Sequence, residues 1–174
     1  SQIVPSQIDW DLFVITGVFM FLDSVLKNFF GIGAAPKKEL ADEVVRAAVN
    51  VDFEMAIAAH ENWKLRLQAF LEGRSTEHFV AEEICFDDRC DLGKWIHTAG
   101  RAKLGAFPGF TALQGHHKMF HYAASNVVAL AQAGKTDEAR KMLDVQFAQH
   151  SNEVVRDLKM LNVLASEGKL DTRH

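Results

Sequence analysis

Cysteine and clustered positive charge are both scarce in this sequence of 174 residues. Its only cysteines are Cys85 and Cys90, too few for the disulfide scaffold of a small secreted protein and in keeping with a reducing compartment. Lys and Arg total 19 against 23 Asp and Glu, which gives a net charge of −4 without any basic run. We therefore expect neither nucleic acid nor an anionic membrane as a partner, because both bind clustered Lys and Arg.

Long apolar runs are also missing. In the most apolar segment, residues 12–30, the longest uncharged run is the eleven residues from Leu12 to Leu22, whereas a membrane-spanning helix needs about 20. Asp9 and Asp11 precede it where a signal peptide carries basic residues. We expect no membrane span and no signal peptide. Helical spacing instead predicts a helix packed on the domain or on a second copy of the chain, with docking on a partner or at a membrane surface as the alternative.

The sequence is rich in helical periodicity. Apolar residues make up 48% of the chain and charged residues 24%, an ordinary composition for one globular domain. Apolar residues three and four apart predict long helices at 38–72, 110–131 and 137–166, the last with Thr136 as its N-cap. The glycines and proline of 31–36 separate an N-terminal part, 1–37, from a helical domain, 38–168. Strand signals are almost absent, so the economical architecture is an up-down helical bundle.

His117 and His121 stand one turn apart in the predicted helix at 110–131. Residues four apart share a helix face, with Cβ atoms about 5–6 Å apart, so both rings can reach one ion. The spacing alone is a weak signal, because histidines on apolar helices are more often core or surface residues. Both lie on the core-facing side, where an uncompensated polar ring is costly. His116 projects about 100° away and is predicted to face solvent.

Two upstream residues complete a candidate ligand set. His60 lies in the buried stripe of the helix at 38–72, where a lone histidine is more often a satisfied core residue and gains weight only from the others. Cys90 opens a short helix, whose free N–H groups and dipole favour a negative sulfur. Three imidazoles and one thiolate form a complete tetrahedral shell for Zn²⁺. The predicted zinc ligands are His60, Cys90, His117 and His121.

Four protein ligands leave no open position on the metal for a substrate or an activated water. The sequence therefore predicts a site that is not an enzyme's, and argues against a zinc hydrolase. The thiolate stays open to strong oxidants, and its oxidation to a sulfenic or sulfinic acid would weaken its bond to the metal. Such a site can report zinc, an oxidant, or both.

These residues resemble the CZB (chemoreceptor zinc-binding) domains of bacteria. The family pattern is a His followed closely by an aromatic residue, then Cys-x-apolar-Gly-x-aromatic, then His-x-x-x-His. The three pieces stand in this sequence at 60–63, 90–95 and 117–121. The resemblance covers about residues 44–164.

The resemblance implies an all-α fold, an antiparallel four-helix bundle with a short extra helix carrying the Cys ligand, here preceded by the apolar N-terminal helix. It also implies three histidines and one cysteine on zinc, a cytoplasmic location and frequent homodimers. In the family the domain usually regulates chemoreceptors or cyclic-di-GMP synthesising enzymes, in response to zinc or hypochlorite. These 174 residues hold no receptor signalling hairpin and no cyclase domain, so we expect the signalling output in a domain or protein outside this chain.

Three alternatives stay open. A hemerythrin-like di-iron bundle would bind oxygen, but it needs more histidines and bridging carboxylates than His150 and Glu153 supply. A metalloenzyme would leave one of the four ligands off the metal. A structural zinc domain would bind zinc too tightly to sense it. Cys85 is either a spare thiol or a resolving partner for oxidised Cys90.

Overall fold

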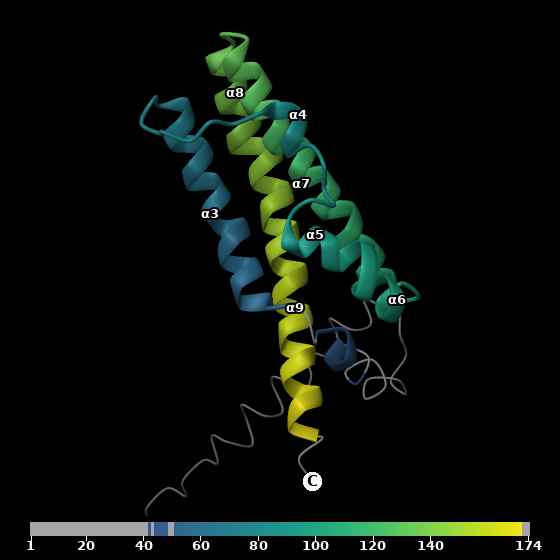
Figure 1. Cartoon of the computed structure of the whole chain (residues 1–174). Coiled ribbons are helices and arrows are strands. Elements are labelled where there is room, and N and C mark those ends of the chain that lie inside the picture. The colour runs from purple at the N-terminus through teal and green to yellow at the C-terminus, as the bar shows by residue number, and fades with distance from the viewer. Residues whose placement is uncertain (1–41, 43, 49–50, 172–174) are drawn as a thin grey trace, which may run out of the picture. The chain divides into compact units, whose positions relative to one another are not determined.

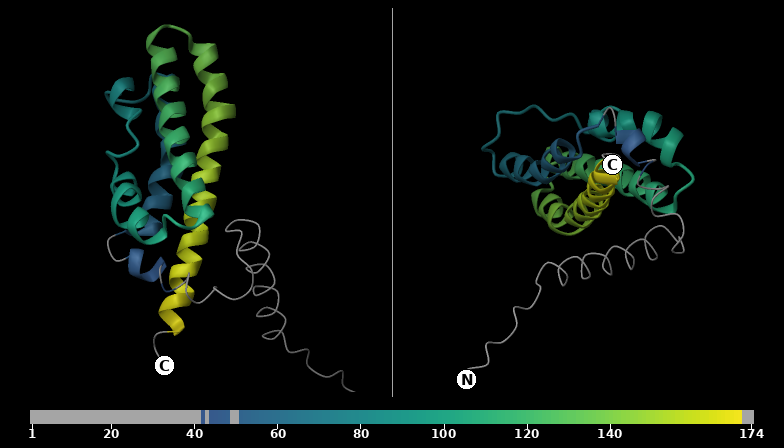
Figure 2. Two further views of the ribbon diagram at one scale, coloured as in Figure 1. Left: turned by 90° about the vertical axis from the view of Figure 1, so that its right-hand side faces the viewer. Right: turned by 90° about the horizontal axis from the view of Figure 1, so that it is seen from below.

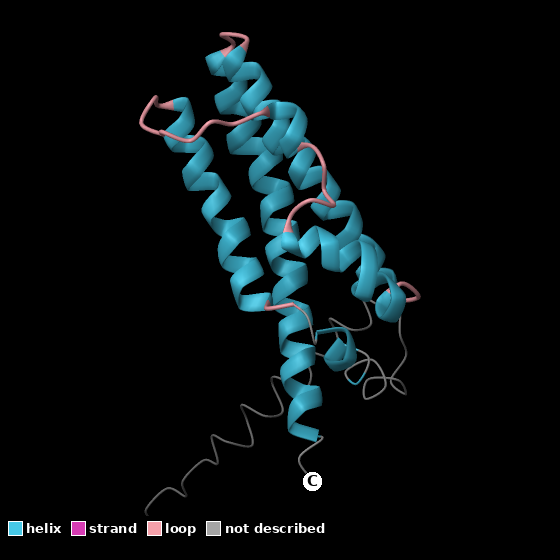
Figure 3. Cartoon of the chain, viewed as in Figure 1, coloured by secondary structure: helices cyan, strands magenta, loops and turns pink. Residues whose placement is uncertain are grey.

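The structure is a computed structural model that describes residues 42, 44–48 and 51–171, with side chains up to residue 166. Every regular element in this part of the chain is a helix, and no strand occurs there (Figure 3). The predicted all-α class is confirmed. The predicted N-terminal helix at 12–30 and the predicted domain boundary at residue 37 lie outside these residues and stay predictions.

Three long helices pack side by side (Figure 1). They are α3 (Phe53–Leu71), α7 (Pro108–Gln132), and a continuous run of α8 (Thr136–Met142), the π-helical turn η3 (Leu143–Phe147) and α9 (Ala148–Asp171). The α9 helix contacts both α3 and α7. Gly134 has a φ of 76° in the connection between α7 and α8, a left-handed conformation that glycine adopts without strain. The chain turns back there, so α7 and the α8–α9 run are antiparallel (Figure 2).

A series of short helices joins α3 to α7. They are α4 (Ala81–Ile84), α5 (Asp91–Trp95), the π-helical turn η2 (Ile96–Gly100) and α6 (Arg101–Leu104). The predicted short helix that begins at Cys90 is confirmed, since Cys90 is the N-cap of α5. The α4 helix packs against α7. The described residues include no fourth long helix, so the complete four-helix bundle stays a prediction.

The predicted helix at 38–72 is not continuous. Residues 44–47 are helical, but Val51 and Asp52 are not, and α3 begins only at Phe53. The carboxylate of Asp52 accepts a hydrogen bond from the Met55 backbone N–H at 3.0 Å, which makes Asp52 an N-cap. Both segments bury apolar residues, so the apolar periodicity continues through the break. The periodicity therefore did not indicate that a new helix starts at Phe53, a start that the Asp52 cap determines.

The last helix also differs from its prediction at both ends. Thr136 is the first helical residue and Lys135 is the N-cap, with no side-chain cap bond. Asp137 and Glu138 occupy the first turn instead, where their negative charges stabilise the positive end of the helix dipole. At the other end the helix continues to Asp171, five residues beyond the predicted residue 166.

Aromatic side chains fill the core between the long helices. Phe120 and Phe147 are both fully buried, and the ring centroid of Phe120 lies 4.9 Å from that of His60 and 5.1 Å from that of Phe147. Trp95, also buried, donates its Nε1–H to the carbonyl of Ala47 at 2.8 Å. This packing brings the inner faces of α3 and α7 together.

None of the described helices combines the length and the apolar character that a bilayer span requires.

Candidate metal centre

Four side chains from three separate segments of the sequence meet where α3, α5 and α7 come together. One ligand-type atom from each lies within 4.8 Å of those of the other three, and no other group of this kind is found in the part of the chain that the structure describes. These residues are His60, Cys90, His117 and His121. The structure therefore brings together all the ligands that the sequence predicts.

His117 and His121 project into the protein from the inner face of α7. They are 0% and 5% exposed, and their ring centroids are 4.7 Å apart. Pro108 lies in the first turn of α7, where its missing N–H leaves no bond unmade. Leu113 and Phe120 are buried along the same helix. The apolar face that packs α7 into the core is thus the face that presents both rings, as their spacing predicted.

Backbone carbonyls orient two of the three rings. His60 Nδ1 lies 2.7 Å from the carbonyl oxygen of Ala56, and His121 Nδ1 lies 2.7 Å from that of Ile84. A carbonyl only accepts, so each Nδ1 carries the proton and each Nε2 keeps a free lone pair. The Nε2 atom of His121 is buried without a hydrogen-bond partner among the described residues. Metal-binding histidines are typically held in this way.

The third ring lies directly beside the thiol. His117 Nε2 is 3.4 Å from Cys90 Sγ, close to the separation of about 3.5 Å that a nitrogen and a sulfur have on one tetrahedral zinc ion. His117 Nδ1 is buried and finds no partner in the described part of the protein. A buried polar atom without a partner costs on the order of 1–3 kcal/mol. His121 Nε2, by contrast, is both unsatisfied and free to bind a metal, and together with the sulfur and the other imidazoles it fits a zinc cation.

Cys90 is held by the first turn of α5. Its Sγ accepts the backbone N–H of Gly93 at 3.2 Å. A Cβ on Gly93 would lie 1.8 Å from the carbonyl oxygen of Asp87, so only glycine lets the preceding loop approach this turn. The Cys-x-x-Gly spacing therefore has a steric reason, because the loop and the helix that fix the sulfur are in backbone contact.

Burial controls the protonation of the cluster. It lowers the pKa of His60 to about 4 and, together with the neighbouring rings of His121 and His60, lowers that of His117 to about 2. Burial also lowers the pKa of His121. All three rings are neutral at pH 7 and offer lone pairs. Burial raises the pKa of the Cys90 thiol despite the bond from the Gly93 N–H, so the expectation that the helix terminus favours the thiolate is outweighed, and a bound cation is needed to displace the proton.

A cleft reaches the cluster from one side. Its volume is about 760 Å³, and it opens between α3 and the segment formed by α5 and η2. His60, Cys90 and His121 line it. His117 lies behind them, fully buried. Small solutes can therefore approach the sulfur without any helix moving.

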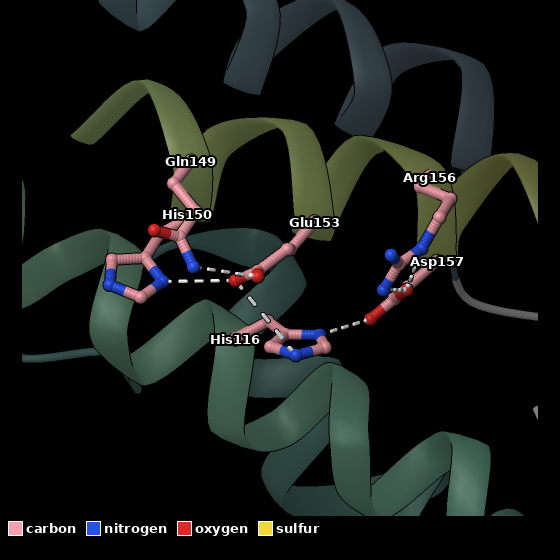
Figure 4. A network of polar contacts seen from close by, with 6 residues as sticks. All are labelled: His116, Gln149, His150, Glu153, Arg156 and Asp157. Atoms are coloured by element: carbon pink, nitrogen blue, oxygen red, sulfur yellow. Dashed lines mark hydrogen bonds and ion pairs between the residues drawn. The ribbon is translucent and has the colours of Figure 1, made fainter. Parts of the chain in front are cut away.

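His116 faces solvent only in part, with its side chain 28% exposed. Its Nδ1 lies 2.6 Å from the carboxylate of Asp157 on α9, and its Nε2 lies 3.9 Å from that of Glu153 (Figure 4). The prediction that it faces solvent holds only in part, because the face 100° from the core stripe also meets α9. His150 is partly exposed, and its Nδ1 lies 3.0 Å from the carboxylate of Glu153. These side chains satisfy one another, and none of them joins the cluster.

Sequence reasoning missed the groups that support the ligands. The Ile84 carbonyl is a main-chain atom and leaves no trace in the sequence. Asp87 accepts a hydrogen bond from His97 Nε2 at 2.8 Å, and the only sequence signal is their closeness to Cys90. Cys85 lies outside the cluster, and its thiol is 3.1 Å from the carbonyl of Glu82.

An all-helical domain in which three imidazoles and one thiol converge belongs to the class of zinc-binding modules. Residues 60–128 match the sequence profile of the chemoreceptor zinc-binding domain, CZB. The match includes all four clustered residues, so this part of the chain is a CZB domain, a type of sensory zinc-binding module that is typically not catalytic. Neither curated proteins nor solved structures give a match to the chain.

Proposed function

We propose that the chain is a regulatory zinc-binding sensory module and not an enzyme. The observation that carries this proposal is the convergence of three neutral imidazoles and one thiol within a CZB domain. The proposed zinc ligands are His60, Cys90, His117 and His121. A bound zinc ion supplies the positive charge that stabilises the thiolate and links α3, α5 and α7. Any change at the sulfur then alters how firmly these three helices are joined.

We propose further that the signal is zinc itself or a thiol oxidant such as hypochlorite. The cleft beside Cys90 gives such small molecules access to Sγ. The thiolate sulfur would attack hypochlorous acid, forming an S–O bond while the oxidant takes two electrons and leaves as chloride, so that the products are a sulfenic acid and Cl⁻. A sulfenic acid is a poorer ligand than a thiolate, and the three remaining histidines would hold zinc less tightly.

Zinc release on oxidation tests the oxidant proposal. Zinc-loaded protein is mixed with stoichiometric hypochlorite, and a chromogenic chelator reports free zinc. We expect release from the wild type and from Cys85→Ser, the matched control in which the other thiol is removed. The Cys90→Ser variant should already bind zinc weakly before any oxidant is added.

The same experiment separates the second candidate, a structural zinc site, from a sensor. The burial of three of the four ligands favours tight binding. No release at stoichiometric oxidant, together with an affinity within the range of cellular free zinc, would leave zinc sensing. No release and an affinity far tighter than that range would identify a structural zinc domain. A di-iron centre has no support in the described residues, where His150 and Glu153 pair with each other.

The partner and the output extend this proposal. We propose a cytoplasmic homodimer with the complete four-helix bundle, whose output acts on chemotaxis or on cyclic-di-GMP signalling through a domain or protein outside this chain. Light scattering on the purified chain, with and without zinc, measures the oligomeric state. A monomer in both conditions would contradict the homodimer and leave the zinc site unaffected.

A further inference from the structure

The loop that carries Cys90 is fastened to the helix that follows it. Residues 85–90 connect α4 to α5 without regular structure. Within this loop the Asp87 carboxylate accepts a hydrogen bond from His97 Nε2 in η2 at 2.8 Å. Both side chains are largely covered, with exposures of 18% for Asp87 and 33% for His97. The pair therefore bridges the segments before and after Cys90.

The backbone makes a second contact at the same place. The carbonyl of Asp87 lies so close to Gly93 that a Cβ there would be 1.8 Å from its oxygen. Gly93 in turn donates its N–H to Cys90 Sγ at 3.2 Å. The turn that holds the sulfur is thus the turn on which the Asp87 backbone rests. A shift of the loop at Asp87 would shift the sulfur.

We propose that Asp87 and His97 are positioning residues for the thiol, and that their side-chain pair keeps Cys90 Sγ directed at His117 Nε2 by holding the loop against α5. The proposal rests on the proposed function, since it concerns how zinc is bound. Neither residue is among the four that cluster around the candidate site. Removing a group that orients a metal ligand typically lowers metal affinity by about 10–100-fold. Here the reason is that a loop that is not held in place must be ordered when the metal binds.

Charge offers a competing explanation, and the chain contains a control for it. Asp87 and Asp91 both lie near enough to Cys90 that their negative charges raise the pKa of its thiol. Among the described residues, Asp91 forms an ion pair only with Lys94 on its own helix, at 3.3 Å, and its side chain is fully exposed. Removing Asp91 takes one negative charge away from the sulfur without freeing the loop. Asp87→Ala and Asp91→Ala therefore separate positioning from charge.

The test measures the zinc Kd by competition with a chromogenic chelator. We expect Asp87→Ala to raise the Kd about 10–100-fold and His97→Ala to raise it by a similar factor. Asp91→Ala should stay within about 5-fold, as expected for an exposed ion pair. Asp87→Asn keeps an oxygen acceptor for His97 and should recover part of the affinity. Equal effects of Asp87→Ala and Asp91→Ala would overturn the proposal in favour of charge.

Two further measurements tie the effect to the sulfur. In a Cys90→Ala background Asp87→Ala should no longer change the zinc Kd, because there is no thiol to position; an undiminished effect would overturn the proposal. With Co²⁺ in place of zinc, Asp87→Ala should weaken the sulfur-to-cobalt charge-transfer absorption, whereas Asp91→Ala should not. Circular dichroism shows whether each variant is folded, and if Asp87→Ala is not, His97→Ala decides.

Failure of the proposed function has a different outcome. Wild-type protein that does not bind zinc, or Cys90→Ala protein that binds it as tightly as the wild type, would overturn the zinc site itself. If the zinc affinity depends on Cys90 but not on Asp87 or His97, only the positioning role is overturned.

Discussion

His116 and His117 are neighbours on α7, yet they lie on two faces that offer their imidazole rings different polar partners. On the inner face, His117 and His121 are buried, and each keeps a ring nitrogen that no described residue satisfies. On the face toward α9, His116 lies between the carboxylates of Asp157 and Glu153 (Figure 4). The faces thus differ in whether a buried ring nitrogen is left without a protein partner, which is the property expected of a candidate ligand.

From the comparison of the two faces, the largest effect is expected on zinc affinity, when a residue of the inner cluster is substituted. His121→Ala and Cys90→Ser should each weaken zinc binding at least about 100-fold, more than the loss of a supporting group, because they remove a ligand. His116→Ala and the exposed His78→Ala should leave the affinity unchanged. Isothermal titration of the four variants measures this. A loss from His116→Ala as large as that from His121→Ala would show that the inner face is wrongly assigned.

Acid should destabilise the metal-free protein through the inner face. His60 and His117 have pKa values of about 4 and about 2 in the folded chain against 6.5 for an ordinary histidine. Between pH 6.5 and 4 the unfolded chain binds more protons than the folded one, so stability falls as the pH falls. At pH 5 each ring should lower the free energy of unfolding by about 2 kcal/mol relative to neutral pH.

Thermal unfolding of metal-free protein at pH 7 and pH 5 checks this sign. The Tm should fall by on the order of 10 °C. The double variant His60→Gln with His117→Gln carries no titrating ring at these positions and serves as the control, with a much smaller fall. A Tm equally sensitive to pH in that variant would place the acid effect elsewhere in the protein.

The smallest effect is expected on the α9 face. His116→Ala should lower the free energy of unfolding by about 1–3 kcal/mol, because it leaves the buried Asp157 carboxylate with Arg156, on the same helix, as its remaining hydrogen-bond partner among the described residues. Denaturant unfolding measures the change. Adding Asp157→Asn should recover part of the loss, since the buried charge is then removed. No loss of stability from His116→Ala would mean that the pair of His116 and Asp157 does not stabilise the fold.

The sequence predicted most of what depends on spacing along one helix. The four-residue spacing from His117 to His121 places both rings on one face whatever surrounds them, and the apolar stripe of α7 identified that face as the buried one. The short helix at Cys90 followed from local signals in the same way. The break before α3 was missed because Asp52 acts through a single cap bond that the apolar pattern does not record.

Contacts between elements could not be predicted to the same degree. The pairing of His116 with Asp157 joins residues 41 positions apart, and nothing in either local sequence indicates the other. The bond from His121 to Ile84 ends on a main-chain carbonyl that every residue possesses. The link from Asp87 to His97 crosses a loop whose path depends on how closely it approaches Gly93.

By itself the sequence determined the helical class, the inner face of α7 and the four candidate ligands in their order, because periodicity and side-chain chemistry are local properties. Only the tertiary structure decided that His60 and Cys90 reach that face, that His116 is bound by α9 and that a cleft opens beside the sulfur. These are properties of distance between elements, and distance is set by packing of the whole core rather than by any one segment.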